Sequence, residues 1–321
     1  MDAPSVMHPL PMSSHLRLMT RLKTRHLQLL AAIDRLGSLS RAAREAQVSQ
    51  PAATKTLAEL EAIFEAPLFL RTGGRLVATD LGRLATGRAL RMLQDFENWA
   101  CEMQAVRAGH TATLRVGAVP YVSGELLGRT ASCLFKDHGI SLTLVRATSD
   151  QLTTSLAKHE LDCVIGRAVP GALAEGFTHE LLFPQKPALI AHPTLATRLG
   201  RRSPDWKALA QLNWILPSPA TPIGAVVLEL FARAQARPPT PVIETYSLDV
   251  ITGMLRNDPT LISIIPENLA RELVRGGEIG IVDWRLDWSL PPMTLIRRKQ
   301  EPARWAEDQL ALVLHALCAT S

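Results

Sequence analysis

The chain of 321 residues has few cysteines and no run of apolar residues long enough to cross a membrane. Its four cysteines, Cys101, Cys133, Cys163 and Cys318, show no CxxC spacing, and its nine histidines show no metal-ligand spacing. We therefore expect reduced thiols and no metal site, with a redox pair of Cys133 and Cys163 as the alternative. No stretch approaches ~18 consecutive apolar residues, and the first 22 residues lack the apolar segment of a secretory signal. These absences predict a cytoplasmic protein without membrane association.

The sequence also lacks the short motifs that mark common enzyme classes. It has no P-loop, no GxGxxG fingerprint and no GxSxG nucleophile elbow. Ser123 lies in Val-Ser-Gly, which lacks the first glycine of the elbow. We therefore expect neither catalysis nor a cofactor. An enzyme fused to another module is the alternative, and turnover of a bound metabolite would establish it.

Residues 38–64 have the pattern of a helix-turn-helix, the two-helix unit whose second helix enters a DNA major groove. A short first helix is followed by a turn at Gln47 and Val48, with Val48 as its apolar plug. Ser49 is placed to cap the second helix, and Pro51 suits a first turn that needs no amide hydrogen. The second helix then carries one apolar stripe, at Ala53, Leu57, Leu60 and Phe64.

The other face of that second helix is predicted to contact DNA. It begins with short or polar side chains that can reach base edges and phosphates: Ser49, Gln50, Pro51, Thr54 and Lys55. Glutamine can form two hydrogen bonds with adenine, and lysine can reach guanine or phosphate. An ordinary helical hairpin with a solvated polar face is the alternative.

Residues 67–79 have the pattern of a β-hairpin with a Gly73-Gly74 tip, directly after the second helix. The hairpin presents Arg71 and Arg75. A wing of this kind beside a recognition helix suits contact with a minor groove or its flanking phosphates. Its presence favours DNA binding over a plain helical hairpin.

Positive charge is concentrated in the same region. The whole chain has a formal net charge of +5. Residues 17–91 hold thirteen Lys and Arg against six Asp and Glu, a net of +7, whereas residues 92–321 hold twenty-two against twenty-three, a net of −1. This distribution is typical of a DNA-binding head joined to a nearly neutral body, so we expect double-stranded DNA as a partner.

A long helix is predicted over 81–109, because Thr79 and Asp80 can cap its start and Gly109 can end it. Apolar residues in 4-3-4 alternation form a heptad seam along it: Ala85, Ala89, Met92, Phe96, Trp99, Met103 and Val106. We favour a dimerisation helix, because helix-turn-helix proteins commonly place two heads on two half-sites. A helix packed on its own domain is the alternative.

From residue 113 short apolar runs alternate with helical stretches, the βαβ rhythm of a parallel sheet in an α/β fold. Buried strands are expected at 113–119, 141–147, 162–169, 187–192, 213–218, 241–247 and 260–266, with a late strand at 293–299 and a closing helix over 302–319. Two such α/β units, with the chain returning to the first, predict two lobes joined by crossing strands.

We therefore divide the chain into four parts. These are a disordered lead-in (1–20), a winged helix-turn-helix (21–80), a linker helix (81–109) and an effector-binding domain (112–321). Lobe I of that domain is expected over 112–184 and 289–321, and lobe II over 185–288.

Small ligands bind at the carboxyl ends of such strands, in the crevice between lobes. Polar side chains fall there at Tyr121, Ser123, Thr148, Ser149, Arg167, Ser218, Thr221 and Ser247. Helices that start near Ser123, Ser149 and Ser247 would offer N–H groups to an anion. Plain helix capping is the alternative for each serine and threonine, and Arg167 either pairs with a carboxylate of the protein or awaits one from a ligand. A body that only oligomerises and takes no ligand is a further alternative.

Residues 25–84 resemble the head of LysR-type transcriptional regulators. The resemblance is most specific at Ala42-Ala43, Val48-Ser49-Gln50-Pro51-Ala52, Leu60-Glu61, Pro67-Leu68-Phe69, Arg71, Thr79 and Gly82. The remainder is similar in order and length to the family's effector domain, a two-lobed α/β fold like that of periplasmic binding proteins. The RHLQLL and QPAATKTLAELE stretches lean toward relatives that regulate aromatic-acid or sugar-uptake genes.

The resemblance implies a bacterial homodimer or homotetramer that binds an interrupted inverted repeat near a promoter. A small effector between the lobes would change DNA bending and contact with RNA polymerase. The family's DNA contacts fall on Gln50, Pro51, Thr54, Lys55 and Arg71. Its effector contacts fall on Ser123, Thr148 and Arg167, with 218–221 and Ser247 opposite, and Arg167 favours an effector that carries a carboxylate.

Overall fold

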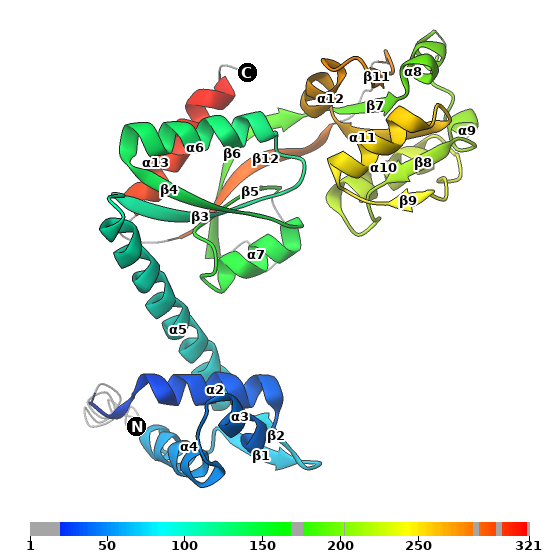
Figure 1. Cartoon of the computed structure of the whole chain (residues 1–321). Helices are drawn as coiled ribbons and strands as arrows, with labels where there is room; N and C mark the ends of the chain where they lie inside the picture. The colour runs from blue at the N-terminus through cyan, green and yellow to red at the C-terminus, as the bar shows by residue number, and fades with distance from the viewer. Residues whose placement is uncertain (1–19, 168–175, 202, 285–288, 300–303, 320–321) are drawn as a thin grey trace, which may run out of the picture. The chain divides into compact units, whose positions relative to one another are not determined.

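The computed structural model describes residues 20–167, 176–201, 203–284, 289–299 and 304–319. The chain divides into two compact units, Met1–Cys101 and Glu102–Ser321, and each is described by itself (Figure 1). The predicted lead-in falls outside the described residues, apart from its last one. In the part of the chain that is described, no helix is long and apolar enough to cross a membrane.

The first unit begins with three helices around a small apolar core, α2 (Thr24–Leu36), α3 (Leu39–Glu45) and α4 (Gln50–Phe64). Helix α2 ends at Gly37, whose φ of 61° lies in the left-handed region that favours glycine. Ser38 then caps α3 by accepting a hydrogen bond from the Arg41 backbone N–H at 3.4 Å. Ala42 and Ala43 are buried, so α3 packs closely against its neighbours.

The wing follows as an antiparallel hairpin of β1 (Phe69–Thr72) and β2 (Arg75–Ala78), which confirms the predicted hairpin (Figure 1). Gly73 and Gly74 between the strands have φ of 58° and 79°, the positive values of a two-residue turn that matches strand twist. The backbone N–H of Leu76 donates to the carbonyl of Gly37 at 2.9 Å. This bond fixes the wing against the end of α2.

The long helix α5 (Asp80–Arg107) closely matches its predicted range. Thr79 caps its start, because its hydroxyl accepts from the Gly82 N–H at 2.9 Å. The predicted seam divides into two parts. Ala85 and Ala89 are buried in the core of their own head. This part of the helix therefore packs on its own domain, which was the alternative to a dimerisation helix. The other seam residues are between 42% and 62% exposed: Met92, Phe96, Trp99, Met103 and Val106.

The second unit contains two five-stranded sheets, and the lobe I sheet has the strand order β4-β3-β5-β12-β6. Its strands are β3 (Ala112–Ala118), β4 (Ile140–Arg146), β5 (Cys163–Gly166), β6 (Phe177–Gln185) and β12 (Leu290–Arg298). Strands β4, β3 and β5 run parallel, while β12 runs antiparallel to both β5 and β6. The helices of this lobe are α6 (Gly124–His138), α7 (Ser149–Ala157) and α13 (Trp305–Ala319).

The lobe II sheet has the order β11-β7-β10-β8-β9. Its strands are β7 (Pro187–Ala191), β8 (Asn213–Leu216), β9 (Ile243–Glu244), β10 (Leu261–Pro266) and β11 (Gly280–Ile281). Its helices are α8 (Pro193–Gly200), α9 (Trp206–Leu209), α10 (Pro222–Arg233), α11 (Leu248–Asn257) and α12 (Glu267–Val274). The rings of Trp214 and Phe231 meet edge to face at its centre, and the Trp214 indole N–H is satisfied by the Leu209 carbonyl at 2.7 Å.

Several strand predictions need correction. The sheets are mixed rather than parallel, because β12 and β7 run antiparallel to their neighbours. Strand β4 was expected to be buried, but it is an edge strand and is exposed from Thr143 onward. The strand expected over 241–247 is reduced to the two residues of β9. Strand β6 is absent from the predicted strands, which were located by runs of apolar residues. In β6 the buried residues are separated by partly or fully exposed ones, so no such run appears.

Candidate DNA interface and effector pocket

The start of α4 forms the candidate recognition surface. Ser49 is its N-cap, with the side-chain oxygen accepting from the Ala52 N–H at 3.3 Å. Gln50, Pro51, Thr54 and Lys55 are all exposed, and Thr54 turns its hydroxyl back to the Gln50 carbonyl at 2.9 Å. The predicted DNA-contacting residues of this helix therefore lie on one accessible surface at its first turns.

The opposite side of α4 packs into the head, although the turn before it differs from the prediction. Ala53 and Leu60 are buried, and Leu57 and Phe64 are half-buried, as the apolar stripe predicts. Val48 is 45% exposed, so its predicted role as an apolar plug is wrong. The turn closes instead through backbone bonds, including Val48 N–H to the Ala43 carbonyl at 3.0 Å.

Arg71 and Arg75 are both exposed on the wing, but they lie on opposite faces of the hairpin. Arg75 is directly opposite Thr72 and Arg71 is opposite Leu76, and neighbouring pairs in a ladder point to opposite sides. The Arg75 guanidinium lies against Gly37: a methyl group added at Gly37 would be 3.3 Å from Arg75 Nε.

A cavity of about 270 Å³ lies beyond the carboxyl ends of the lobe I strands, with lining residues from both lobes. Six predicted effector residues line it: Tyr121, Thr148, Ser149, Arg167, Ser218 and Thr221. The rest of the lining is mostly apolar and includes Val119, Pro217, Ile223 and Tyr246. An apolar cavity with a few convergent polar groups is the usual form of a small-molecule site.

Arg167 supplies the positive charge of this cavity. It follows β5, is only 3% exposed, and donates from Nη2 to Oε1 of Gln185 at 2.5 Å. Its guanidinium carbon lies 6.0 Å from the centre of the Tyr121 ring. Burial lowers the pKa of Arg167 to about 10, so the group remains charged at neutral pH. Within the described residues no carboxylate pairs with this buried charge.

Three buried polar atoms next to Arg167 find no hydrogen-bond partner in the described part of the chain: Tyr121 OH, Arg167 Nε and Gln185 Nε2. Burial raises the pKa of Tyr121 to about 12, so its phenol keeps a proton to donate. All three atoms can therefore donate a hydrogen bond, and a ligand that satisfies them needs acceptor oxygens. Gln185 lies outside the described lining but accepts the hydrogen bond from Arg167. The sequence analysis missed it because it belongs to the overlooked strand β6.

Two helices from the two lobes begin at the cavity. Thr148 is the N-cap of α7, and Thr221 caps α10 by accepting from the Gly224 N–H at 3.1 Å. Helix N-termini carry partial positive charge and favour anions. The Asp150 side chain, also in the lining, adds one negative charge on the exposed side.

Two of the predicted effector residues, Ser123 and Ser247, lie outside the described lining of the cavity. The Ser123 hydroxyl accepts from the N–H groups of Glu125 and Leu126 at the start of α6, at 3.1 and 3.3 Å. The Ser247 hydroxyl likewise accepts from the Val250 N–H at 3.4 Å at the start of α11. For both residues plain helix capping is the interpretation that fits.

The four cysteines are free thiols, with Cys163 buried and Cys133 partly buried, so the alternative of a Cys133–Cys163 disulfide is not formed. Burial raises the pKa of the Cys163 thiol. A raised pKa disfavours the thiolate, which is the reactive form.

Both parts of the chain match family models. Residues 24–83 match the model of bacterial regulatory helix-turn-helix proteins of the lysR family, and residues 107–318 match the LysR substrate binding domain. The HTH-type transcriptional regulator GbpR of Azospirillum brasilense is 29% identical over 290 residues, which cover 89% of this chain and 83% of that relative. The regulator PcaQ of Agrobacterium fabrum is 31% identical over 295 residues, which cover 88% and 91%.

Solved structures share the same order of domains. Full-length CbnR in complex with its target DNA aligns with a TM-score of 0.62 at 20% identity, over 92% of this chain and 99% of that one. Full-length BenM aligns with a TM-score of 0.53 at 17% identity, over 93% and 97%. The fold is therefore a helix-turn-helix head followed by a two-lobed α/β domain. The curated relatives are regulators rather than enzymes, and this chain belongs to the LysR family of bacterial DNA-binding transcriptional regulators.

Proposed function

We propose that this regulator is controlled by a small metabolite that carries a carboxylate and binds in the cavity between its lobes. The observation that carries the proposal is the buried, charged Arg167, which has no carboxylate partner among the described residues. A buried charge is costly to the folded protein unless it is paired. A ligand carboxylate would supply a negative partner for this charge and accept hydrogen bonds from the unpaired Tyr121 and Arg167 atoms, which belong to lining residues.

The other features of the cavity agree with this ligand class. The starts of α7 and α10 add positive ends of helix dipoles. The apolar lining at Val119, Pro217 and Ile223 suits the hydrocarbon part of such a ligand. The lean toward aromatic-acid or sugar-uptake regulators stays a prediction.

Thermal-shift screening tests the proposal with small carboxylic acids, each paired with its uncharged amide, alongside neutral sugars. At ~100 times its dissociation constant a true ligand should add about 2.7 kcal/mol of stability. We expect a response to an acid and not to its amide, and loss of that response in Arg167→Met. Ser247→Ala is the matched control, because Ser247 lies outside the lining. A ligand that is neutral, or that still binds Arg167→Met, would contradict the anionic assignment, and silence across the library would favour a body that only oligomerises.

We also propose that the exposed half of the seam on α5, from Met92 to Val106, joins two copies of the chain. Large apolar side chains at heptad spacing normally bury against another helix. Trp99→Glu should shift the solution mass toward the monomer, as measured by light scattering. Gln104→Glu adds the same charge off the seam and should leave the mass unchanged. An unchanged mass for Trp99→Glu would rule out this seam, and the mass of the unaltered protein would distinguish a dimer from a tetramer.

For the head we propose that Ser49, Gln50, Pro51, Thr54 and Lys55 contact the major groove and that the wing contributes Arg71 and Arg75. Their exposure on the first turns of α4 and on the hairpin supports this assignment. Two joined heads would recognise an interrupted inverted repeat. We further propose that the protein works in the cytoplasm, where its DNA lies, and that effector binding alters DNA bending and contact with RNA polymerase. The division into a head (21–80), a linker helix (81–109) and an effector domain (112–321) belongs to the same proposal.

A further inference from the structure

A buried carboxylate, Asp162, lies at the start of β5, at the end of the strand remote from the cavity. It is tightly held by Arg115 of β3: Nη2 donates to Oδ1 at 2.8 Å, and the Arg115 backbone N–H donates to Oδ2 at 2.8 Å. The Asp162 N–H returns a bond to the Arg115 carbonyl at 2.8 Å. Burial alone raises the pKa of Asp162, but the bonds and charge of Arg115, with a smaller effect of Arg304, lower it overall. Asp162 is therefore a fixed negative charge.

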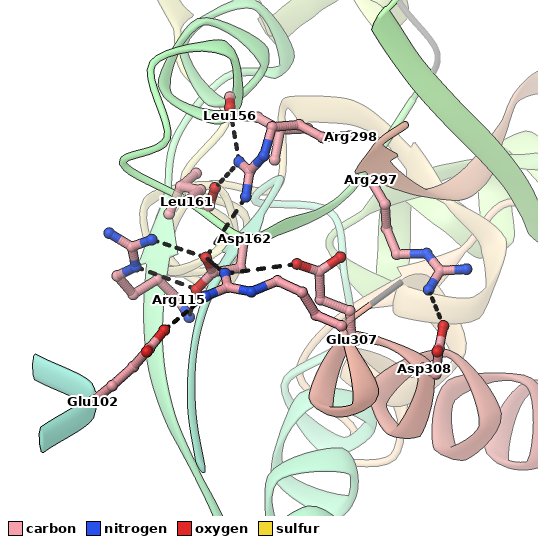
Figure 2. A network of polar contacts seen from close by, with 10 residues as sticks. Glu102, Arg115, Leu156, Leu161, Asp162, Arg297, Arg298, Glu307 and Asp308 are labelled. Carbon is pink, nitrogen blue, oxygen red and sulfur yellow. Dashed lines mark hydrogen bonds and ion pairs between the residues drawn. The ribbon is translucent and has the colours of Figure 1, made fainter. Parts of the chain in front are cut away.

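Arg304, just before α13, connects this carboxylate to the linker helix. Its Nη1 donates to Oδ1 of Asp162 at 3.1 Å, and its Nη2 donates to Oε1 of Glu102 on α5 at 2.6 Å. Glu307 on α13 lies 3.9 Å from the same guanidinium. We call Glu102, Arg304 and Asp162 the linker anchor. Figure 2 shows Asp162 at the centre of these contacts, with Glu102 at one side and Glu307 at the other.

Arg298 adds a further positive charge beside Asp162. Arg298 also approaches Asp162, with Nη2 and Oδ1 3.7 Å apart, and donates to the Leu156 carbonyl at 2.9 Å. Within the described residues Arg115, Arg298 and Arg304 approach the carboxylate of Asp162, and Arg304 also approaches those of Glu102 and Glu307.

The strands that hold the anchor also hold the effector cavity. Strand β3 runs from Arg115 toward Val119 and Tyr121, and β5 runs from Asp162 toward Arg167. The two strands are paired in parallel, with Val116 opposite Cys163. Five residues of strand span about 17 Å. The anchor and the cavity therefore occupy opposite ends of the same two strands.

We propose that the linker anchor positions the last turns of α5 on the strands that carry the cavity, through an ion pair that can open. The Glu102 and Arg304 side chains are 44% and 39% exposed, so their pair is accessible to water and salt, whereas Asp162 is not. Glu102 and Arg304 lie outside the cavity lining, so we assign them a positioning role. A role of the linker anchor in regulation rests on the proposed control by a ligand. The ion pair itself does not depend on that proposal.

Hydrogen exchange of the full-length protein, without DNA or any added ligand, tests the anchor. The amides to follow are those that close the end of α5, such as Gly109 N–H to Val106 and His110 N–H to Ala105. Glu102→Gln keeps the shape of the side chain and removes its charge. We expect exchange over 103–110 to become about 1.5- to 5-fold faster, the change that corresponds to loss of an exposed ion pair.

Glu97→Gln is the matched control, since it removes the same charge from an exposed position five residues earlier on the same helix. It should leave exchange over 103–110 unchanged. At about 1 M NaCl, where charges are screened within ~3 Å, the difference between Glu102→Gln and the unaltered protein should disappear. Equal exchange in Glu102→Gln and Glu97→Gln would overturn the proposal. So would a difference that persists at high salt, because that would indicate packing rather than an ion pair. Both exchange comparisons are made without ligand, so a ligand screen that finds nothing would not affect them.

Discussion

Replacing Arg167 and Gln185 together by apolar residues, as Arg167→Met with Gln185→Leu, should not destabilise the free protein. The pKa of Arg167 falls from 12.5 to about 10 on burial. Because one pKa unit corresponds to about 1.4 kcal/mol, the buried charge costs the folded state about 3 kcal/mol. The folded-state pKa lies below the unfolded one, so this cost is fully present below pH 10 and fades between pH 10 and 12.5.

Two favourable contacts offset part of that cost. The hydrogen bond from Arg167 to Gln185 is worth about 1.5–3 kcal/mol as a charged bond, and the contact with the Tyr121 ring about 0.5–1 kcal/mol. The double variant removes both partners, so no new buried polar group is left alone. We expect it to be equally stable or more stable by about 1 kcal/mol, a rise in melting temperature of about 2–4 °C for a unit of this size.

Urea unfolding at neutral pH measures the difference, and DNA affinity in the absence of ligand should be unchanged. Arg167→Met alone is the informative intermediate, because it leaves the Gln185 side chain without its partner and should be less stable than the double variant. A loss of more than about 2 kcal/mol in the double variant would show that Arg167 is a structural anchor. The case for a missing ligand carboxylate would then fail.

Three further results are expected. Lys55→Ala should weaken DNA binding, and if Lys55 contacts only phosphate the salt slope should become shallower by about 0.9 with equal loss on all sequences; an unchanged slope with altered base preference would reject that contact. Gly224→Ala should destabilise lobe II by about 1–3 kcal/mol, because its Cβ would lie 2.1 Å from the Ser218 carbonyl oxygen. Gly253→Ala has open space at its Cβ and should not destabilise, so equal losses in thermal unfolding would discount the clash. Burial, and then the charge of Arg25, lower the pKa of His26. In the folded protein His26 therefore resists protonation, so the free energy of unfolding should fall as the pH drops below about 6.5. An equally steep fall in His26→Gln would assign that loss to other groups.

The head was predictable because its signals are local in the sequence. Ser49 and Pro51 mark the start of α4 within three residues, and Gly73-Gly74 specifies a two-residue hairpin whatever surrounds it. The prediction of Val48 as an apolar plug is wrong because backbone hydrogen bonds close that turn. The residue types in the sequence do not indicate such bonds. Ala85 and Ala89 were assigned to a dimer seam because a heptad pattern does not identify which surface buries it.

The cavity was predictable in part, and the linker anchor was not. The rule that ligands bind at strand ends located Tyr121, Thr148 and Arg167, since each follows a recognisable apolar run. Gln185 depends on the pairing of β6 with β12, a strand more than a hundred residues later. Asp162 and Arg304 are 142 residues apart. Contacts of this separation leave no pattern within a short window of sequence.

Selection of DNA from a random-sequence pool by the full-length protein, at near-physiological salt, is the most direct test of sequence-specific recognition by this head. The enriched sequences should contain an interrupted inverted repeat. Binding to them should be tighter than to shuffled DNA of equal length by a factor of about 1,000 or more. If no sequence is enriched and all DNA binds equally and weakly, the head interacts with DNA only through its positive charge, and the protein does not recognise a specific operator.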